Sequence, residues 1–295
     1  MVSISVIIPA YCSQDTVAAA LDSLLTQTRP ADQILLVDSS PDNATEQIVR
    51  RFEPAITVIR SHARLYPHEA RNLGMQQATG DLLVFTDPDI VAHPDLLARL
   101  DQAYSMTGRV IIGGVDCLGR RWIDVGVHLC KFDIWLPGGP GRPLEIGPSI
   151  NFCISRPVLE MVGGFPPDRM LGDTTLSWAL AEIGQTLWFE PSAVVAHHHD
   201  QTVSGLFRER FRRGREFGAL RMVHGRWTAA RVLLWWLTSV VPLRLIKLLS
   251  RRVKNGVRAG WLGWFFLTWP VVLVGESGWV WGESAAYWAW LRGRS

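Results

Sequence analysis

The first half of the chain alternates short β-branched runs with helical patterns, and this alternation constrains the fold more than any other feature. Strands are predicted at residues 4–9, 33–38, 55–60 and 81–86, with helices at 13–26, 43–52, 67–78 and from 94 onward. Strand–helix alternation at this spacing predicts an α/β fold with a mostly parallel, doubly wound sheet and flanking helices. In such sheets ligands bind outside the carboxyl ends of the strands.

Two of the predicted strands end in acidic residues. Asp38 closes one strand, and another runs into a Thr-Asp-Pro-Asp sequence that places Asp87 and Asp89 on either side of a rigid proline. One interpretation is that an acid caps the next helix, which residues 93–95 open. The other is that both acids face a divalent cation, because Mg²⁺ and Mn²⁺ prefer carboxylate oxygens. Both strand ends lie where this kind of sheet binds ligands.

The middle of the chain has a mixed pattern. A Gly/Pro-rich loop at 136–148 is followed by predicted strands at 149–155 and 187–197 and predicted helices at 173–183 and 204–222. Strands and helices therefore continue beyond the regular alternation of the first half.

Charge is distributed very unevenly along the 295 residues. Residues 1–207 hold 14 Lys and Arg against 23 Asp and Glu, whereas residues 208–258 hold 14 against 2. A basic segment of this kind indicates a partner that carries phosphates, either nucleic acid or anionic lipid. Its position between apolar stretches favours lipid, and the segment has no recognised nucleic-acid motif. We therefore expect an anionic membrane leaflet as a partner, and no nucleic acid.

The last seventy residues are rich in tryptophan. Ten of the 14 tryptophans lie at or after Trp227, and residues 232–243 and 261–275 form uncharged runs of 12 and 15 residues. Each run is shorter than the roughly 20 apolar residues of a spanning helix. Tryptophan beside Arg and Lys is typical of the membrane interface. Interfacial helices or a shallow hairpin are therefore expected, with a buried pair of core helices as the alternative.

Cysteine usage and the first residues both indicate a reducing compartment. The four cysteines are widely spaced and form no metal-binding pattern, which is typical of buried free thiols. The sequence MVSISVIIPAY lacks the basic region that opens a signal peptide and reads directly as a strand. A catalytic part of the chain is therefore expected in the cytoplasm.

Six short motifs follow one another in a characteristic order. They are SVIIPAY near the start, LLVDSSPDNAT (35–45), HEARNLG (68–74), GDLLVFTDPD (80–89), GGFPPDRMLGDTTLSWAL (163–180) and VVAHHH (194–199). Together they resemble the inverting family-two glycosyltransferases with the GT-A fold, over residues 3–220. The resemblance implies a GT-A catalytic domain at 1–222, which leaves 223–295 as a Trp-rich, helical, membrane-associated region.

The resemblance assigns a nucleoside diphosphate sugar as donor, with Pro9 and Tyr11 of the first motif among its binding residues. Asp38 falls where the family places an acid that accepts hydrogen bonds from the nucleobase. Arg71 matches the arginine of the RN-x-G motif, whose guanidinium can neutralise diphosphate oxygens. Asp87, the first acid of the D-x-D motif, is expected to contact the ribose or a water molecule.

The resemblance also implies a divalent cation, either Mn²⁺ or Mg²⁺. Asp89, the second acid of D-x-D, is the expected direct ligand. His197 stands where some GT-A enzymes have a histidine that completes the metal shell, and neutral imidazole is a suitable ligand for manganese. Histidines at a surface strand end are the alternative interpretation.

Asp173 falls where the family places its catalytic base. Inversion needs a carboxylate that takes the proton of the acceptor hydroxyl as that hydroxyl attacks the sugar. The sequence departs from the family pattern nearby, because Gly172 replaces the acid before the base, Thr175 replaces a second acid, and Ser39 follows Asp38. Asp173 is also well placed to cap its helix.

These residues predict an inverting glycosyltransferase at the cytoplasmic face of the cell membrane. It would transfer a sugar from a nucleoside diphosphate donor to a hydroxyl of a glycan or lipid-linked acceptor. One alternative is a polyprenyl-phosphate sugar synthase, whose anionic acceptor needs no general base. The other is a catalytically degenerate scaffold for a membrane complex, which the missing acids keep open.

Overall fold

The computed structural model describes residues 2–166 and 171–293. The chain forms two compact units. Unit 1 comprises Met1–Leu118 and Pro137–His198, and unit 2 comprises Gly119–Leu136 and His199–Ser295. These two units are defined by how the chain packs. The predicted division into a catalytic domain at 1–222 and a membrane-associated region at 223–295 is a division by function, and it stays a prediction.

Unit 1 is built on one sheet that has nine strands within the described residues. The strands are β1 (Ile4–Ala10), β2 (Gln33–Asp38), β3 (Thr57–Arg60), β4 (Leu82–Thr86), β5 (Ile90–Ala92), β6 (Val110–Cys117), β7 (Arg142–Leu144), β8 (Asn151–Ser155) and β9 (Leu187–His197). Every residue of β1 and β4 is buried. This burial on both faces explains why these strands read as continuous apolar runs.

The sheet is mixed, which corrects the predicted mostly parallel arrangement. Its order is β3-β2-β1-β4-β8-β6-β9-β5, and β7 also pairs with β9. Neighbouring strands are parallel from β3 to β4 and between β6 and β9, but β8 is antiparallel to both β4 and β6. The short strands β5 and β7 run antiparallel to β9. An apolar run predicts a strand but carries no information on its direction, so only the first four strands could be oriented from their helical crossovers.

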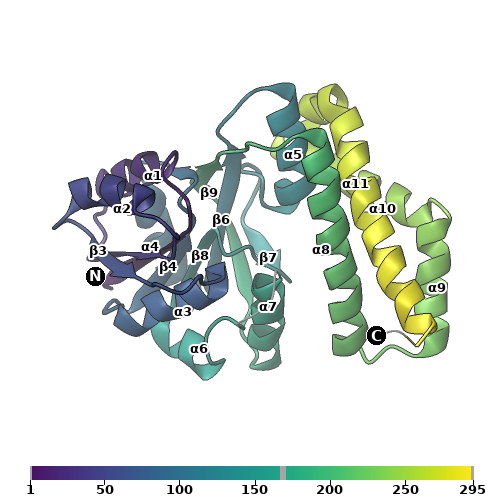
Figure 1. Ribbon diagram of the computed structural model, residues 1–295, viewed down its shortest axis with the longest axis horizontal. Coiled ribbons are helices and arrows are strands. Elements are labelled where there is room, and N and C mark those ends of the chain that lie inside the picture. Colours follow the sequence, from purple (N-terminus) through teal and green to yellow (C-terminus); the bar gives the residue numbers. More distant parts are fainter. Residues whose placement is uncertain (1, 167–170, 294–295) are drawn as a thin grey trace. The chain divides into compact units, whose positions relative to one another are not determined.

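Helices flank the sheet of unit 1 (Figure 1). They are α1 (Val17–Leu25), α2 (Ala44–Val49) with a 3-10 turn at Arg50–Phe52, α3 (Pro67–Gln77), α4 (Leu96–Thr107), α6 (Arg156–Met161) and α7 (Gly172–Glu182). Helix α3 packs on β1 and β2, and α4 packs on β6 and β9. A Cβ atom on Gly74 of α3 would lie 2.6 Å from Cγ2 of Ile7, so this glycine permits the close packing of helix and sheet.

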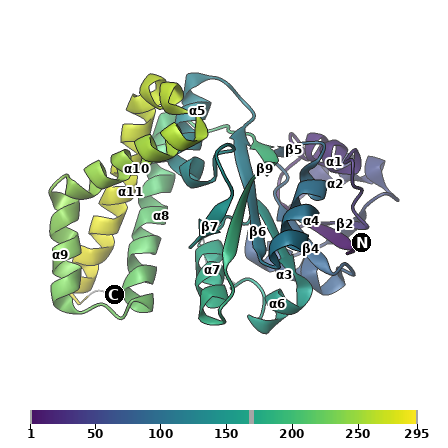
Figure 2. The same ribbon diagram turned by 180° about the vertical axis from the view of Figure 1, so that it is seen from behind.

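Unit 2 is helical. It contains α5 (Trp122–Phe132) with a 3-10 turn at Asp133–Trp135, α8 (Val203–His224), α9 (Ala229–Val240), α10 (Leu243–Ala259) and α11 (Leu262–Leu291). Helices α8 and α11 lie side by side (Figures 1 and 2). Glycine allows their backbones to approach closely. A Cβ atom on Gly214 of α8 would lie 2.2 Å from the carbonyl oxygen of Trp279, and a Cβ atom on Gly282 of α11 would lie 2.0 Å from the carbonyl oxygen of Phe211.

Buried ion pairs connect the helices of unit 2. Glu276 and Glu283, seven residues apart on α11, are both completely buried. Glu276 pairs with Arg210 of α8 and Arg252 of α10. Glu283 is bound in the same way, by one arginine from α8 and one from α10, namely Arg221 and Arg244. Each buried acid is therefore compensated by two arginines, as burial of a charge requires.

Among the described helices, none has by itself the length and apolar content to cross a membrane. Helices α9 and α10 together meet these criteria as a pair bent by 72°.

Candidate active site

The first four parallel strands bring their carboxyl ends to one edge of the sheet. Because β3, β2, β1 and β4 are neighbours in this order, this edge carries Arg60, Asp38, Tyr11 and Asp87 at or just after the ends of successive strands. We call it the carboxyl edge. Sequence reasoning predicted three of these four residues as donor-binding residues, and the sheet order brings their strand ends together.

Asp38 is completely buried at the end of β2. Its Oδ1 accepts hydrogen bonds from the Ser40 backbone N–H at 2.9 Å and from the Ser40 hydroxyl at 2.6 Å, and its Oδ2 pairs with Arg60. Arg60 also donates to the carbonyl oxygens of Ser40 and Asp42, both at 2.8 Å. The carboxylate thus holds the loop after β2, and its role toward a nucleobase stays a prediction.

The first motif ends at the exposed side of the same edge. Pro9 is buried within β1, whereas the Tyr11 ring is 40% exposed. The guanidinium carbon of Arg64 lies 4.6 Å from the centre of that ring, within range of a cation–π interaction. Cys12 has a positive φ of 49° and donates its N–H to the Ser40 hydroxyl at 2.8 Å, which connects the loops after β1 and β2.

Arg71 and Asp87 form an ion pair at the end of β4. Arg71 is 2% exposed, and its guanidinium lies 5.8 Å from the centre of the Phe165 ring. The Asp87 side chain keeps 27% exposure. Burial raises the pKa of the Asp87 carboxyl, Arg71 lowers it, and the nearby charge of Asp89 raises it further. Arg71 thus compensates an acid of the D-x-D motif.

Asp89 and His197 lie next to each other. Strands β5 and β9 pair so that Ile90 faces His197, and the His198 N–H donates to the Asp89 carbonyl oxygen at 2.8 Å. This register places His197 Nε2 3.4 Å from Asp89 Oδ2. The structure therefore brings together the two residues that sequence analysis predicted as metal ligands, although 107 residues separate them in the chain.

The capping alternative for the D-x-D acids is wrong. The short strand β5 begins at Ile90, directly after Asp89, and the following helix has Asp95 at its N-cap. The Asp89 carboxylate and the His197 imidazole lie 3.4 Å apart, and the Asp87 carboxylate is close enough to interact with both charges. These groups are a suitable donor set for Mn²⁺ or Mg²⁺. The residues present fit the predicted cation.

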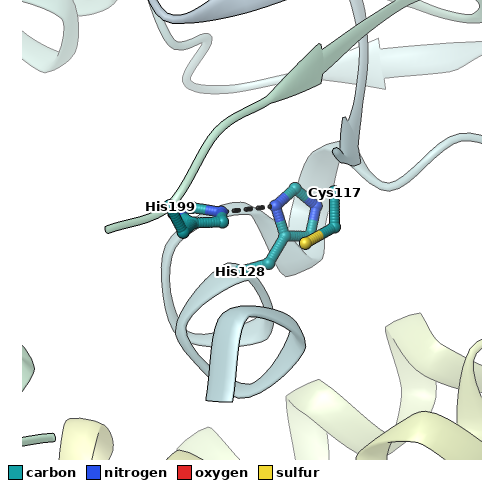
Figure 3. A group of neighbouring side chains, drawn as sticks. All are labelled: Cys117, His128 and His199. Carbon is teal, nitrogen blue, oxygen red and sulfur yellow. Dashed lines mark hydrogen bonds between the residues drawn. The ribbon is translucent and has the colours of Figure 1, made fainter. Parts of the chain in front are cut away.

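The third histidine of the triplet has a different neighbour. His199, in unit 2, is 3% exposed, and its Nε2 lies 3.0 Å from Nδ1 of the fully buried His128 of α5 (Figure 3). One ring nitrogen must donate and the other accept. The His199 side chain therefore contacts another histidine, whereas the His197 side chain lies beside the Asp89 carboxylate.

The predicted base, Asp173, lies half-buried in the first turn of α7. The helix begins at Gly172 with Leu171 at the N-cap, so the expectation that Asp173 caps the helix is wrong. Its Oδ1 accepts the Thr174 N–H at 2.8 Å. The motif that carries Asp173 includes residues 167–170, which lie outside the described residues.

Three residues at the site were not found from the sequence. Arg60 pairs with Asp38, Arg64 lies over Tyr11, and His68 lies between Arg71 and the start of α7. Arg60 could have been found as a cation that ends the strand next to β2, opposite Asp38 in the register. The other two depend on loop and helix packing that no local pattern encodes.

Comparison with known proteins finds a matching family model. Residues 5–138, just under half of the chain, match the model of glycosyl transferase family 2, and this range runs from the second residue of β1 to beyond the D-x-D motif. This part of the chain is similar to glycosyl transferase family 2. This result confirms the resemblance found in the sequence and favours an enzyme over a scaffold.

Two relatives illustrate how far the sequence similarity extends. The glycosyltransferase AglE of Haloferax volcanii is 25% identical over 222 residues, which cover 72% of each chain. An undecaprenyl-phosphate 4-deoxy-4-formamido-L-arabinose transferase of Yersinia pestis is 31% identical over 132 residues, which cover 40% of this chain and 39% of the relative.

Solved structures share the fold of this chain. The mannosyltransferase PcManGT of Pyrobaculum calidifontis, solved with GDP-Man and Mn²⁺, aligns with a TM-score of 0.58 and 20% identity over 92% of this chain and 86% of its own. GalNAc-T7, solved with UDP, GalNAc and Mn²⁺, aligns with a TM-score of 0.57 and 16% identity over 68% of this chain and 44% of its own. Both neighbours therefore contain Mn²⁺.

Proposed function

We propose that this glycosyltransferase moves a sugar from a nucleoside diphosphate donor to a hydroxyl of a glycan or lipid-linked acceptor, in a metal-dependent, single displacement with inversion. The acceptor oxygen attacks the anomeric carbon as the bond to the diphosphate breaks. Asp173 takes the acceptor proton. The donor lies along the carboxyl edge, with its base near Tyr11 and Asp38.

The diphosphate leaves with increasing negative charge, which the site must stabilise. We assign this role to Arg71, whose guanidinium is fixed by Asp87, and to Arg60 at the end of β3 and Arg64 in the loop that follows it. Asp89 and His197 would hold the cation, which supplies Lewis acidity toward the diphosphate oxygens when bound.

The pairing of Asp89 with His197 is the observation that carries this proposal. It is tested by thermal unfolding of the purified protein with UDP, GDP, TDP or CMP, each with and without Mn²⁺. We expect one nucleotide to raise the Tm only when Mn²⁺ is present, and Asp89→Asn to remove this shift. If none of the nucleotides shifts the Tm, the assignment of the donor site is wrong.

A polyprenyl-phosphate acceptor is the second candidate. The Yersinia relative, by its name, acts on undecaprenyl phosphate. Such an acceptor is already an anion and loses no proton, so the reaction would not need Asp173 as a base. This difference separates the two candidates experimentally.

We also propose that residues 1–222 act as the catalytic domain and residues 223–295 bind the anionic cytoplasmic leaflet of the cell membrane. Large apolar side chains on α9, α10 and their connection are exposed to solvent, including Leu234 (60%), Leu243 (57%) and Ile246 (55%). Exposed lysines and arginines on α10 add positive charge beside them. Apolar and cationic side chains together match the two components of an anionic lipid surface.

A further inference from the structure

His68 lies between two parts of the active site. It is 6% exposed on α3, and its ring stacks on Phe165 with the ring centres 5.4 Å apart and the planes 11° apart. Its Nδ1 lies 3.4 Å from a guanidinium nitrogen of Arg71, which pairs with Asp87 of the D-x-D motif. One side of the ring therefore faces the donor side of the site.

The other side of the same ring faces the start of α7. A Cβ atom on Gly172 would lie 2.4 Å from Cδ2 of His68 and 2.7 Å from Nε2, closer than real Cβ contacts allow. Only glycine therefore fits at position 172 beside this ring. Gly172 directly precedes Asp173, the proposed base, so the imidazole occupies the space that a side chain at 172 would otherwise need.

The stacking partner of His68 is itself fixed to α3. Asn72 accepts the Phe165 backbone N–H at 2.8 Å and donates to its carbonyl oxygen at 2.7 Å. Phe165 also contacts Phe85 of β4 edge-to-face, with the ring centres 4.9 Å apart. The imidazole is thus held on a rigid support that belongs to the sheet and α3.

We propose that His68 is a positioning residue, which fixes the first turn of α7 and the Arg71–Asp87 pair in one geometry. Through Gly172 it sets the place of Asp173, and through Arg71 it sets the place of the D-x-D segment. This inference rests on the proposed function. It also explains the missing acid before Asp173, because the ring takes over the space of a side chain at that position.

The test uses the full chain, four variants and one control variant. His68→Asn keeps a polar atom close to the place of Nδ1 but removes the part of the ring that faces Gly172. His68→Ala removes both contacts. Gly172→Ala is made alone and in the His68→Ala background, and Gln76→Ala, an exposed residue of α3, is the control. The readouts are the Tm, the Mn²⁺-dependent Tm shift with GDP and UDP, and hydrolysis of GDP-mannose or a UDP-sugar with water as acceptor.

We expect His68→Asn to keep the nucleotide-dependent Tm shift and to lose about 10²-fold in hydrolysis rate, because a displaced base costs catalysis more than donor binding. His68→Ala should lose both. Gly172→Ala should lower the Tm in the native background and much less in the His68→Ala background, because the two positions interact directly. The control should match the native protein in all three readouts.

Two results would overturn the positioning role. One is hydrolysis by His68→Asn within twofold of the native rate. The other is an equal loss of Tm from Gly172→Ala in both backgrounds, which would mean that the ring and position 172 do not interact. By contrast, a native protein that neither binds the nucleotides with Mn²⁺ nor hydrolyses the donors would refute the proposed function itself, and the positioning role with it.

Discussion

At the scale of single residues, one departure from the family pattern has a neighbour that explains it, and another lies beside a residue that binds Asp38. Ser40, in the segment after Asp38, binds the Asp38 carboxylate through both its hydroxyl and its backbone N–H. Gly172 replaces an acid because the His68 ring occupies the space of a side chain. Gly172 therefore fits its surroundings in this site, and Ser40 holds the carboxylate of Asp38.

A methyl group at Gly74 should destabilise unit 1. Its Cβ would lie 2.6 Å from Ile7 Cγ2 and 3.3 Å from Val37 Cγ2, both within the buried interface of α3 with the sheet. Overpacking of this kind costs about 1–3 kcal/mol. We expect Gly74→Ala to lower the free energy of unfolding by this amount in urea, whereas Gln76→Ala on the exposed side of α3 should not. An unchanged urea midpoint for Gly74→Ala would show that the sheet accommodates the methyl group.

Asp173→Asn should distinguish the two acceptor classes. The amide cannot accept the acceptor proton, so transfer to a hydroxyl should slow by about 10²–10⁴-fold while donor binding is kept. Transfer to a polyprenyl phosphate should continue. The rates of nucleoside diphosphate release with each acceptor, compared with those of the native protein, measure this difference. Glu182→Gln, at an exposed position of the same helix, is the matched control.

At the scale of secondary-structure elements, the arginine-rich helix α8 has a structural role that its sequence did not indicate. The segment was expected to face phosphates, yet Arg210 and Arg221 point to the buried acids of α11. Two of the cations therefore balance acidic side chains within unit 2. The charge available to an anionic partner comes from the exposed residues of α8 and α10.

Helix α8 should also make unit 2 sensitive to acid. Burial raises the pKa of Glu209, but Lys131 and Arg213 outweigh it and bring this pKa to about 2, well below the ordinary 4.5. A carboxyl whose pKa is lower in the folded state stabilises the fold above pH 4.5 and loses this contribution as the pH falls toward 2. We expect the Tm to fall over this range, and to fall less steeply in Glu209→Gln.

The comparison with Glu182→Gln isolates this effect, because Glu182 is exposed on α7 of unit 1. Other acids of the protein also titrate between pH 4.5 and 2, and their contribution is common to all three proteins. Equal slopes of Tm against pH for the native protein and Glu209→Gln would contradict the assignment of the ion pair with Lys131.

At the scale of the whole molecule, membrane binding is the property to test. We expect the protein to bind vesicles that contain phosphatidylglycerol more tightly than neutral phosphatidylcholine vesicles, and added salt to weaken this binding. Leu234→Asp and Ile246→Asp, which place charge on the exposed apolar side chains of α9 and α10, should each weaken binding about tenfold or more. Co-sedimentation measures the bound fraction. Met106→Asp, at an exposed apolar residue of unit 1, should bind as the native protein does.

The sequence alone determined the features that depend on local pattern and composition. Period-2 and apolar runs predicted the strands, so the bounds of β2 (Gln33–Asp38) and β9 (Leu187–His197) were predicted correctly. The predicted ligands Asp89 and His197 meet in space. The basic segment and the Trp-rich tail were visible as composition.

Only the tertiary structure decided which distant residues meet. The reversed direction of β8, the pairing of Asp38 with Arg60 and the contact of His68 with Gly172 all depend on register and packing between segments far apart in the chain. No local pattern carries this information, because a strand or helix has the same periodicity whichever neighbour it packs against. The chemistry of the site could therefore be predicted from its residue types, whereas its geometry required the fold.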